Sequence, residues 1–312
     1  MSFQFNFDVS VDEEQHLSGE DDNKGNPENA SLPTDSTNNS TETLKEAKEL
    51  YTPTDLTAYE SCAVDVVKVG DLELCFLNPD DVESELIISS FSQALKSEED
   101  ESDVSKAVDG HSDLIPKVYE GGLKVWECSL DLVHFLHDAE IPVKNKRVLE
   151  LGCGIGLPGI YAVKKEAAAV HFQDYNEEVI EHMTIPSVIL NKPEEDSTNQ
   201  DLRYLSGDWS LVQKLLTSEE QCSKYDVILT SETIYSLESY DKLYDILRAV
   251  LRPTGVIYLA AKTHYFGVGG GTRSFEDMVK QRGEFNIEVC KTYTRGVKRE
   301  ILKMSFLEAA KD

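Results

Sequence analysis

The arrangement of hydrophobic and polar positions changes near residue 111. From there on, short apolar runs alternate with longer segments whose apolar residues recur at helical spacing. The apolar runs predict strands at 147–151, 169–173, 202–205, 225–230 and 255–261. The amphipathic segments predict helices at 125–138, 157–166, 177–190, 209–217, 238–251 and 274–282. Strands that alternate with helices predict an α/β fold with a doubly wound, Rossmann-like sheet of mostly parallel strands.

The C-terminal pattern departs from this alternation. Two strand-like segments, 285–293 and 298–307, flank a turn at Thr294-Arg295-Gly296, which predicts an antiparallel hairpin. A nicotinamide-binding Rossmann domain would instead end in another parallel strand and helix. The hairpin therefore argues for a different variant of the doubly wound fold.

The first 110 residues predict two further regions. Residues 1–45 are rich in Asp, Glu, Asn, Ser and Thr and poor in apolar residues, so we expect a disordered acidic N-terminal arm. Residues 46–110 form an N-terminal extension, which contains a hairpin at 63–77 and an acidic linker at 96–110. Residues 111–312 would then make up the α/β domain.

Charge and cysteine content narrow the class of protein. The 312 residues carry a formal net charge of −28, and 27 of the 58 acidic residues lie in residues 1–110. Without a basic stripe we expect no direct binding to nucleic acid, whereas the acidic arm could attract a basic partner. The six Cys show no paired or metal-binding spacing, and no apolar segment suits a leader or a membrane span. We therefore expect an intracellular protein that binds neither metal nor membrane.

The segment from Val148 to Gly156 carries the strongest chemical signal. An apolar strand ends in Glu150 and runs into Gly152, Gly154 and Gly156, a spacing typical of a tight turn that opens a helix. The free N–H groups at the start of such a helix suit a polar ligand. The segment therefore predicts a nucleotide-like cofactor.

Three interpretations of this turn remain open. The residues from Gly154 to Gly159 fit the G-x-G-x-x-G pattern of dinucleotide binding, with Asp174 as the acid for a ribose. Alternatively, the cofactor is S-adenosylmethionine, whose cationic methionine part suits the carboxylate of Glu150, whereas a pyrophosphate would be repelled by it. In the third interpretation the turn joins a strand to a helix and binds no ligand.

Further groups of residues favour the methyl donor. Asp174 ends the second strand and could accept both ribose hydroxyls, while Asp208 and Trp209 follow the third strand and suit adenine. Residues 125–129 open a helix that could close over the methionine end. The structural alternatives are helix caps for the two acids and core packing for Trp209 and the helix. The cofactor-binding candidates are Val125, Trp126, Glu127, Cys128, Ser129, Glu150, Gly152, Gly154, Gln173, Asp174, Tyr175, Gly207, Asp208, Trp209 and Ser231.

Five segments carry a more specific signal. They are Leu114-Ile115-Pro116, Tyr119-Glu120-Gly121-Gly122-Leu123-Lys124-Val125-Trp126-Glu127-Cys128, Asp174-Tyr175-Asn176, Ser231-Glu232-Thr233-Ile234-Tyr235 and the run from Ala260 to Gly271. On these segments, over roughly residues 111–307, the chain resembles the protein-histidine N-methyltransferases of the seven-β-strand class. The resemblance implies a seven-stranded sheet with an antiparallel C-terminal hairpin, S-adenosylmethionine as cofactor, and methylation of a histidine in a protein. Known members modify a large-subunit ribosomal protein, which implies a basic protein substrate. We also expect a monomer located in the cytoplasm and nucleus.

The implied reaction needs no strong base, because neutral imidazole is a nucleophile near pH 7 and positioning supplies most of the rate. The ring nitrogen that does not attack carries a proton, so a nearby acceptor should hold it and stabilise the cation that forms. Glu232 is the candidate acceptor, with Tyr235 and His264 as orienting residues. The residues Gly267–Gly271 would form a mobile lid, a substrate-docking loop or a flexible connector.

Two other functions stay open. Relatives with an Asp-x-x-Tyr motif often modify lysine, and Glu232 stands in place of that Asp. A lysine methyltransferase would share the cofactor pocket but would have to deprotonate an ammonium group. A non-enzymatic module that binds a ribosomal protein would keep the fold without turnover.

Overall fold

The computed structural model describes residues 44–53, 57–94, 115, 117–192, 200–218 and 224–307, without the side chains of residues 58 and 88–94. The predicted acidic arm up to residue 43 and the predicted linker at 96–110 lie outside the described residues. Among the helices that are described, none combines the length and the apolar character needed to cross a membrane.

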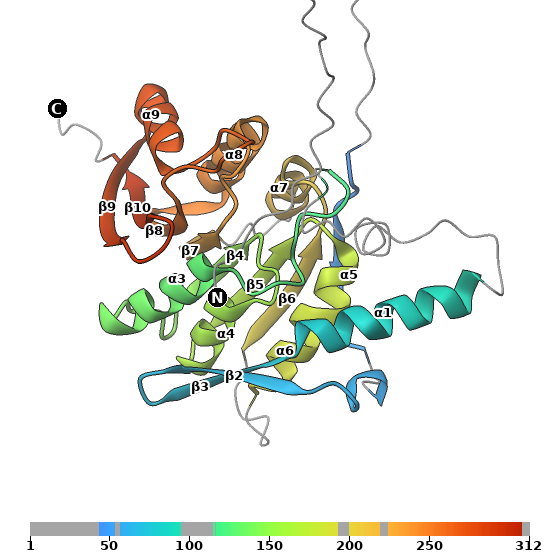
Figure 1. Ribbon diagram of the computed structural model, residues 1–312. Coiled ribbons are helices and arrows are strands. Elements are labelled where there is room, and N and C mark those ends of the chain that lie inside the picture. The colour runs from blue at the N-terminus through green and yellow to red at the C-terminus, as the bar shows by residue number, and fades with distance from the viewer. Residues whose placement is uncertain are drawn as a thin grey trace, which may run out of the picture.

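Within the described ranges, a sheet of eight strands organises the structure (Figure 1), with the order β1-β6-β5-β4-β7-β8-β10-β9. The strands are β1 (Lys48–Leu50), β4 (Arg147–Leu151), β5 (Ala169–Asp174), β6 (Asp201–Ser206), β7 (Tyr225–Ser231), β8 (Leu251–Lys262), β9 (Phe285–Tyr293) and β10 (Arg299–Phe306). Strands β4 to β8 pair in parallel, and β10 lies antiparallel between β8 and β9. The predictions of a doubly wound sheet and of an antiparallel C-terminal hairpin are confirmed.

The eighth strand, β1, comes from the N-terminal extension and was not predicted. It pairs antiparallel with β6 and extends the seven-stranded sheet at its edge. The guanidinium of Arg203 donates two hydrogen bonds of 2.8 Å to the carboxylate of Glu49, so a bidentate ion pair reinforces the short ladder. A strand of three residues, Lys48–Leu50, shows no alternation that sequence analysis could detect.

Helices cover both faces of this sheet (Figure 1). One face carries α3 (Glu127–Asp138), α4 (Leu157–Lys164), α5 (Glu177–Val179), the π-helical η2 (Ile180–Thr184) and α6 (Ile185–Ile189). The other face carries α7 (Trp209–Ser218), η3 (Leu237–Ser239), α8 (Tyr240–Val250) and α9 (Thr272–Arg282). Each face has its own apolar core, with Leu132 and Ile160 in the first and Leu247 and Phe275 in the second. The predicted helix at 177–190 is divided by the π-helical segment.

The N-terminal extension packs onto the first of these cores. The predicted hairpin is confirmed as β2 (Val64–Val69) and β3 (Leu72–Leu77), while η1 (Thr57–Tyr59) and α1 (Pro79–Ala94) were not predicted. Leu74 and Phe76 are buried in the core, and the side-chain amide of Asn191 hydrogen-bonds both backbone groups of Cys75. Asn78 caps α1, because its Oδ1 accepts hydrogen bonds from the first backbone N–H groups of the helix.

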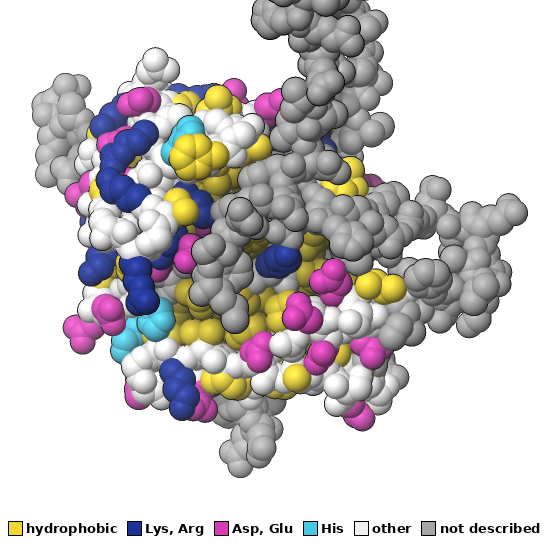
Figure 2. All heavy atoms as spheres, in the orientation of Figure 1, with side chains coloured by type: hydrophobic (Ala, Val, Ile, Leu, Met, Phe, Trp, Pro, Cys, Tyr) yellow, Lys and Arg dark blue, Asp and Glu magenta, His cyan; other side chains and the backbone are white. Residues whose placement is uncertain are grey.

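Charge is unevenly distributed on this scaffold. On the face shown in Figure 2, Lys and Arg side chains gather over the C-terminal strands and α9, whereas acidic side chains dominate over the N-terminal hairpin and α1.

Candidate functional site

A cavity of about 250 Å³ opens at the carboxyl ends of β4, β5, β6 and β7. This edge of an open α/β sheet is where ligands bind, because the strand order reverses there and the loops diverge. The predicted site residues that line the cavity are Trp126, Ser129, Gly152, Gly154, Asp174, Tyr175, Gly207, Asp208, Trp209, Ser231, Glu232 and Tyr235. The structure thus brings together residues from four strand ends and from the start of α3.

The glycine turn forms the floor of the cavity. Gly152, Gly154 and Gly156 adopt φ values of 59°, 50° and 85°, a left-handed conformation that favours glycine. A Cβ on Gly154 would lie 2.9 Å from the carbonyl oxygen of Gly122, so the turn and the loop before α3 approach each other closely. The hydroxyl of Thr184, in the π-helical segment, donates a 2.6 Å hydrogen bond to the carbonyl oxygen of Gly154 and supports the turn from below.

Asp174 is a buried carboxylate at the end of β5 that faces this turn. Its Oδ2 accepts a 2.9 Å hydrogen bond from the backbone N–H of Gly154, and its Oδ1 accepts one of 3.1 Å from Asn176. Burial raises the pKa of Asp174, although these N–H groups oppose the shift. Asp174 therefore supports the start of α5 and also lines the cavity, and its binding to a ribose stays a prediction.

Gln173 does not line the cavity but positions two residues that do. Its Nε2 donates a 3.0 Å hydrogen bond to the carbonyl oxygen of Gly207. Its Oε1 accepts a 2.8 Å hydrogen bond from the indole N–H of Trp209. The side-chain amide thus fixes the indole at the cavity wall, as a positioning residue.

Asp208 is tied to its surroundings by several groups. It accepts a hydrogen bond of 2.9 Å from the backbone N–H of Ser210 and forms an ion pair of 2.8 Å with Lys242. Burial alone would raise the pKa of Asp208, but the hydrogen bonds from Lys242 and Ser210 outweigh it and lower the pKa. Its backbone N–H donates to the carbonyl oxygen of Lys45, next to the lining residue Leu44. The last two residues of the predicted arm therefore belong to the site.

Glu150 was predicted beside the ligand, and the structure places it elsewhere. Its side chain is fully buried, does not line the cavity, and accepts a 2.7 Å hydrogen bond from the backbone N–H of Gly159. Alternate residues of β4 face opposite sides of the sheet, so Glu150 points under α4 with Val148, away from the strand end. Burial raises the pKa of Glu150 well above its ordinary value.

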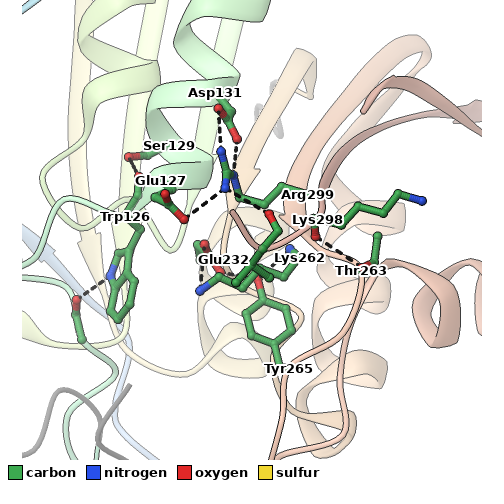
Figure 3. A network of polar contacts seen from close by, with 12 residues as sticks. Trp126, Glu127, Ser129, Asp131, Glu232, Lys262, Thr263, Tyr265, Lys298 and Arg299 are labelled. Atoms are coloured by element: carbon green, nitrogen blue, oxygen red, sulfur yellow. Dashed lines mark hydrogen bonds and ion pairs between the residues drawn. The ribbon is translucent and has the colours of Figure 1, made fainter. Parts of the chain in front are cut away.

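Part of the segment at 125–129 also turns away from the cavity. The residues outside the lining are Val125, Glu127 and Cys128. Arg299 of β10 donates hydrogen bonds to Glu127 at 3.1 Å and to Asp131 at 2.6 Å, which draws Glu127 away from the cavity (Figure 3). Trp126 and Ser129 face the cavity together, since residues three apart share one side of a helix.

Glu232 stands at the centre of a buried polar cluster at the end of β7 (Figure 3). It adopts a φ of 58°, which is strained for a residue other than glycine, and its N–H donates to the carbonyl of Ala260 at 2.9 Å. Its Oε2 accepts a hydrogen bond from the hydroxyl of Tyr265, and its Oε1 lies 3.6 Å from Nζ of Lys262. That Oε1 is buried and makes no hydrogen bond within the described part of the chain. Sequence analysis missed both Tyr265 and Lys262.

His264 was predicted as an orienting residue, and the structure does not place it in the cavity. The side chain is exposed and packs edge-to-face against Phe266, with ring centroids 4.9 Å apart. Tyr265, the next residue, is the one that lines the cavity, and its ring meets that of Tyr235 edge-to-face. Burial, followed by the nearby charge of Glu232, raises the pKa of Tyr265 well above its ordinary value.

The predicted glycine loop after β8 is hydrogen-bonded to the segment after β7 and to α8. The N–H of Gly270 donates a 2.9 Å hydrogen bond to the carbonyl of Tyr235, and the N–H of Gly271 donates one of 2.8 Å to the hydroxyl of Tyr240. A Cβ on Gly270 would lie 2.3 Å from the carbonyl oxygen of Tyr235, so glycine permits this close approach. The loop therefore fixes Tyr235 beside the cavity.

Comparison with known proteins identifies the family to which the chain belongs. A family model described as lysine methyltransferase matches residues 117–280. The histidine protein methyltransferase 1 homologue of Bos taurus is 44% identical in an alignment that covers 65% of this chain and 60% of that protein. Histidine protein methyltransferase 1 of Schizosaccharomyces pombe is 33% identical over 64% of this chain and 69% of that protein. A solved structure from Streptococcus mutans, described as an S-adenosylmethionine-dependent methyltransferase, aligns with a TM-score of 0.50 at 11% identity, covering 78% of this chain and 56% of that one.

The chain therefore belongs to the methyltransferases that use S-adenosylmethionine. Its family is the one whose model, described as lysine methyltransferase, matches residues 117–280. Within that class, it groups with the histidine protein methyltransferase 1 homologues, as the sequence motifs predict. The chain spans about 60% of the length of the bovine relative.

Proposed function

We propose that this chain transfers a methyl group from S-adenosylmethionine to an imidazole nitrogen of a histidine in a protein. The observation that carries the proposal is the orientation of Glu232. Glu232 lines the cavity, and the hydroxyl of Tyr265 fixes one of its carboxylate oxygens. The other oxygen is buried, lies 3.6 Å from the ammonium of Lys262 and makes no hydrogen bond among the described residues. The names of the relatives supply the class of acceptor.

The residues of the cavity fit the cofactor. S-adenosylmethionine, when bound, supplies a methyl group carried on a positively charged sulfonium. The lining contains five carboxylate residues (Glu120, Asp174, Asp208, Glu232 and Glu238) and three lysines (Lys117, Lys124 and Lys242), an acidic balance that suits a cationic ligand and repels a pyrophosphate. Asp174 would hold the ribose, Trp209 the adenine, and Trp126 the methionine end.

Glu232 would act on the acceptor rather than on the cofactor. Its Oε1 would accept the N–H of the substrate imidazole, which aims the lone pair of the other nitrogen at the methyl group. As positive charge develops on the ring, the fixed carboxylate stabilises it without reorganisation. Tyr265 holds the second oxygen, and the ring of Tyr235 would form a wall for the imidazole.

Methylation of a lysine is the second candidate, because the matching family model is described by that activity. A substrate ammonium would have to lose a proton before attack, whereas imidazole is largely neutral above its ordinary pKa of about 6.5. The loss of that proton is the step that favours histidine as the acceptor.

The substrate is proposed to be a basic protein, of the class of large-subunit ribosomal proteins that known family members modify. The acidic lining of the cavity would attract such a protein. We also propose that the chain acts as a monomer in the cytoplasm and nucleus.

One experiment separates these possibilities. The purified chain is incubated with S-adenosylmethionine labelled in the methyl group and with extract from cells that lack the protein. The labelled band is then hydrolysed to amino acids, and the label should appear in methylhistidine. Label in methyllysine would overturn the choice of acceptor, and absence of any labelled protein would favour a non-enzymatic module.

A further inference from the structure

Glu120 lines the cavity and takes no part in the proposed methyl transfer. It lies in the loop before α3 and is fixed at two points. Its Oε1 accepts a 2.7 Å hydrogen bond from the backbone N–H of Lys117, and its own N–H donates one of 3.1 Å to the side chain of Asn176. Asn176 also donates a 2.7 Å hydrogen bond to the carbonyl of Val118, so the loop is bound to the end of β5. These contacts hold the carboxylate of Glu120 in one orientation.

The second carboxylate oxygen of Glu120 lacks a partner. Oε2 is buried and makes no hydrogen bond among the described residues. A buried carboxylate oxygen without a donor costs free energy, so a rigid carboxylate of this kind suits a ligand that brings the donor. Its position in the cavity wall makes the cofactor the nearest source of one.

Building on the proposed function, we propose that Oε2 of Glu120 accepts a hydrogen bond from a ribose hydroxyl of the adenosyl cofactor, beside Asp174. Both oxygens of Asp174 already accept a backbone N–H, from Gly154 and from Asn176. The ribose presents two hydroxyl donors, and a second carboxylate lets each meet its own acceptor. Glu120 is bound to Asn176, two residues beyond Asp174, which places it on the ribose side of the turn.

This arrangement has a pH signature. Burial raises the pKa of Glu120 to about 7. The backbone N–H of Lys117 lowers it, the nearby carboxylate of Asp174 raises it, and the ammonium groups of Lys45 and Lys117 lower it. Because Oε1 is occupied by an N–H donor, a proton would sit on Oε2 and turn the acceptor into a donor. Cofactor affinity should therefore fall as the pH falls through 7.

Calorimetry with two ligands tests the proposal. S-adenosylhomocysteine carries the adenosine and an amino-acid part, whereas 5′-methylthioadenosine carries the adenosine without the amino-acid part. Each is titrated at pH 6, 7 and 8 into the wild type, into Glu120→Gln, and into Glu73→Gln, an exposed control on the hairpin. Wild type and control should bind both ligands about fivefold more weakly at pH 6 than at pH 8, since only about a tenth of a group with a pKa of about 7 is ionised at pH 6 and the protonated form should bind about as weakly as Glu120→Gln.

The Glu120→Gln variant should lose about tenfold in affinity for both ligands at pH 8, and its remaining affinity should not change between pH 8 and pH 6. Unchanged affinity and an unchanged pH profile would overturn the proposal. A loss seen only with S-adenosylhomocysteine would also overturn it, because the partner would then be the amino group of the methionine part.

Two further measurements keep the test decisive. Titrating wild type with the 2′-deoxy and the 3′-deoxy forms of 5′-methylthioadenosine removes one ribose hydroxyl at a time without a mutation. The form that lacks the hydroxyl bound to Glu120 should show a flattened pH profile of affinity. The same wild-type pH dependence for both deoxy forms would contradict the ribose contact. The labelling experiment is independent of these titrations. If the titrations give the expected results while the labelled product is methyllysine, the choice of histidine is refuted and the role of Glu120 stands.

Discussion

The Glu232→Gln variant should lose turnover while it keeps its cofactor. The amide preserves the shape and the acceptor oxygen for Tyr265 but removes the negative charge beside the forming imidazolium. Two unit charges about 4 Å apart interact by about 4 kcal/mol at an effective dielectric constant of about 20. The ammonium of Lys262, 3.6 Å from the same carboxylate, offsets part of this. We therefore expect a loss of about 3 kcal/mol in the transition state, or roughly 10²-fold in rate.

Single-turnover measurements with saturating S-adenosylmethionine isolate the chemical step from binding and product release. Affinity for S-adenosylhomocysteine, measured by calorimetry on the same variant, should stay within about twofold of wild type. Tyr265→Phe should cause a smaller loss, because it removes the donor to Oε2 and leaves the charge. The Glu73→Gln control should behave like wild type. A normal rate in Glu232→Gln would remove this carboxylate from the mechanism and direct attention to Tyr235 and Tyr265.

Three further outcomes are expected. Asp174→Ala should weaken cofactor binding by about 1–3 kcal/mol in calorimetry, because a charged acceptor and the support of the N–H of Gly154 are both lost; normal binding would assign Asp174 to the fold alone. A chain that starts at residue 44 should keep the cofactor affinity and the melting temperature of the full chain. A chain that starts at residue 51 loses β1, so its cofactor affinity and melting temperature should both be lower. Equal values for the two truncated chains would show that β1 contributes little. Burial lowers the pKa of His171 to about 4, so the unfolded chain binds a proton that the folded chain excludes between pH 6.5 and 4. Urea unfolding should show stability falling by up to about 3 kcal/mol as the pH decreases through that window, and a flat profile would contradict the burial of a neutral His171.

The parallel sheet was predictable from sequence because its strands are buried on both faces. The strand predicted at 169–173 agrees with β5 to within one residue, and all of β5 is buried. The elements that were missed have weaker signals. Strand β1 has three residues and depends on the ion pair between Glu49 and Arg203, which joins positions 154 residues apart. A contact across that distance leaves no local periodicity.

The side of the sheet on which a residue lies decides whether it reaches the ligand. Asp174 and Glu150 are both acids at the ends of neighbouring strands. Asp174 is the last residue of β5, where the chain leaves the sheet, and its carboxylate turns toward the glycine turn. Glu150 lies one residue inside the end of β4 and points into the space beneath α4. A shift of one residue thus separates a lining carboxylate from a buried structural one.

Irregular backbone sets a further limit at the acceptor end of the site. After β8 the chain has neither a strand nor a helix period, so the sequence alone does not say which of His264, Tyr265 and Phe266 faces inward. An imidazole suits an orienting role, so His264 is the residue that the sequence predicts. The hydrogen bonds of the glycine loop instead turn Tyr265 toward Glu232. Glu232 itself holds a positive φ that only its surroundings maintain, through the carbonyl of Ala260 and the hydroxyl of Tyr265. The strain at Glu232 and the inward position of Tyr265 are therefore linked, because the hydroxyl of Tyr265 holds one oxygen of the strained residue's carboxylate.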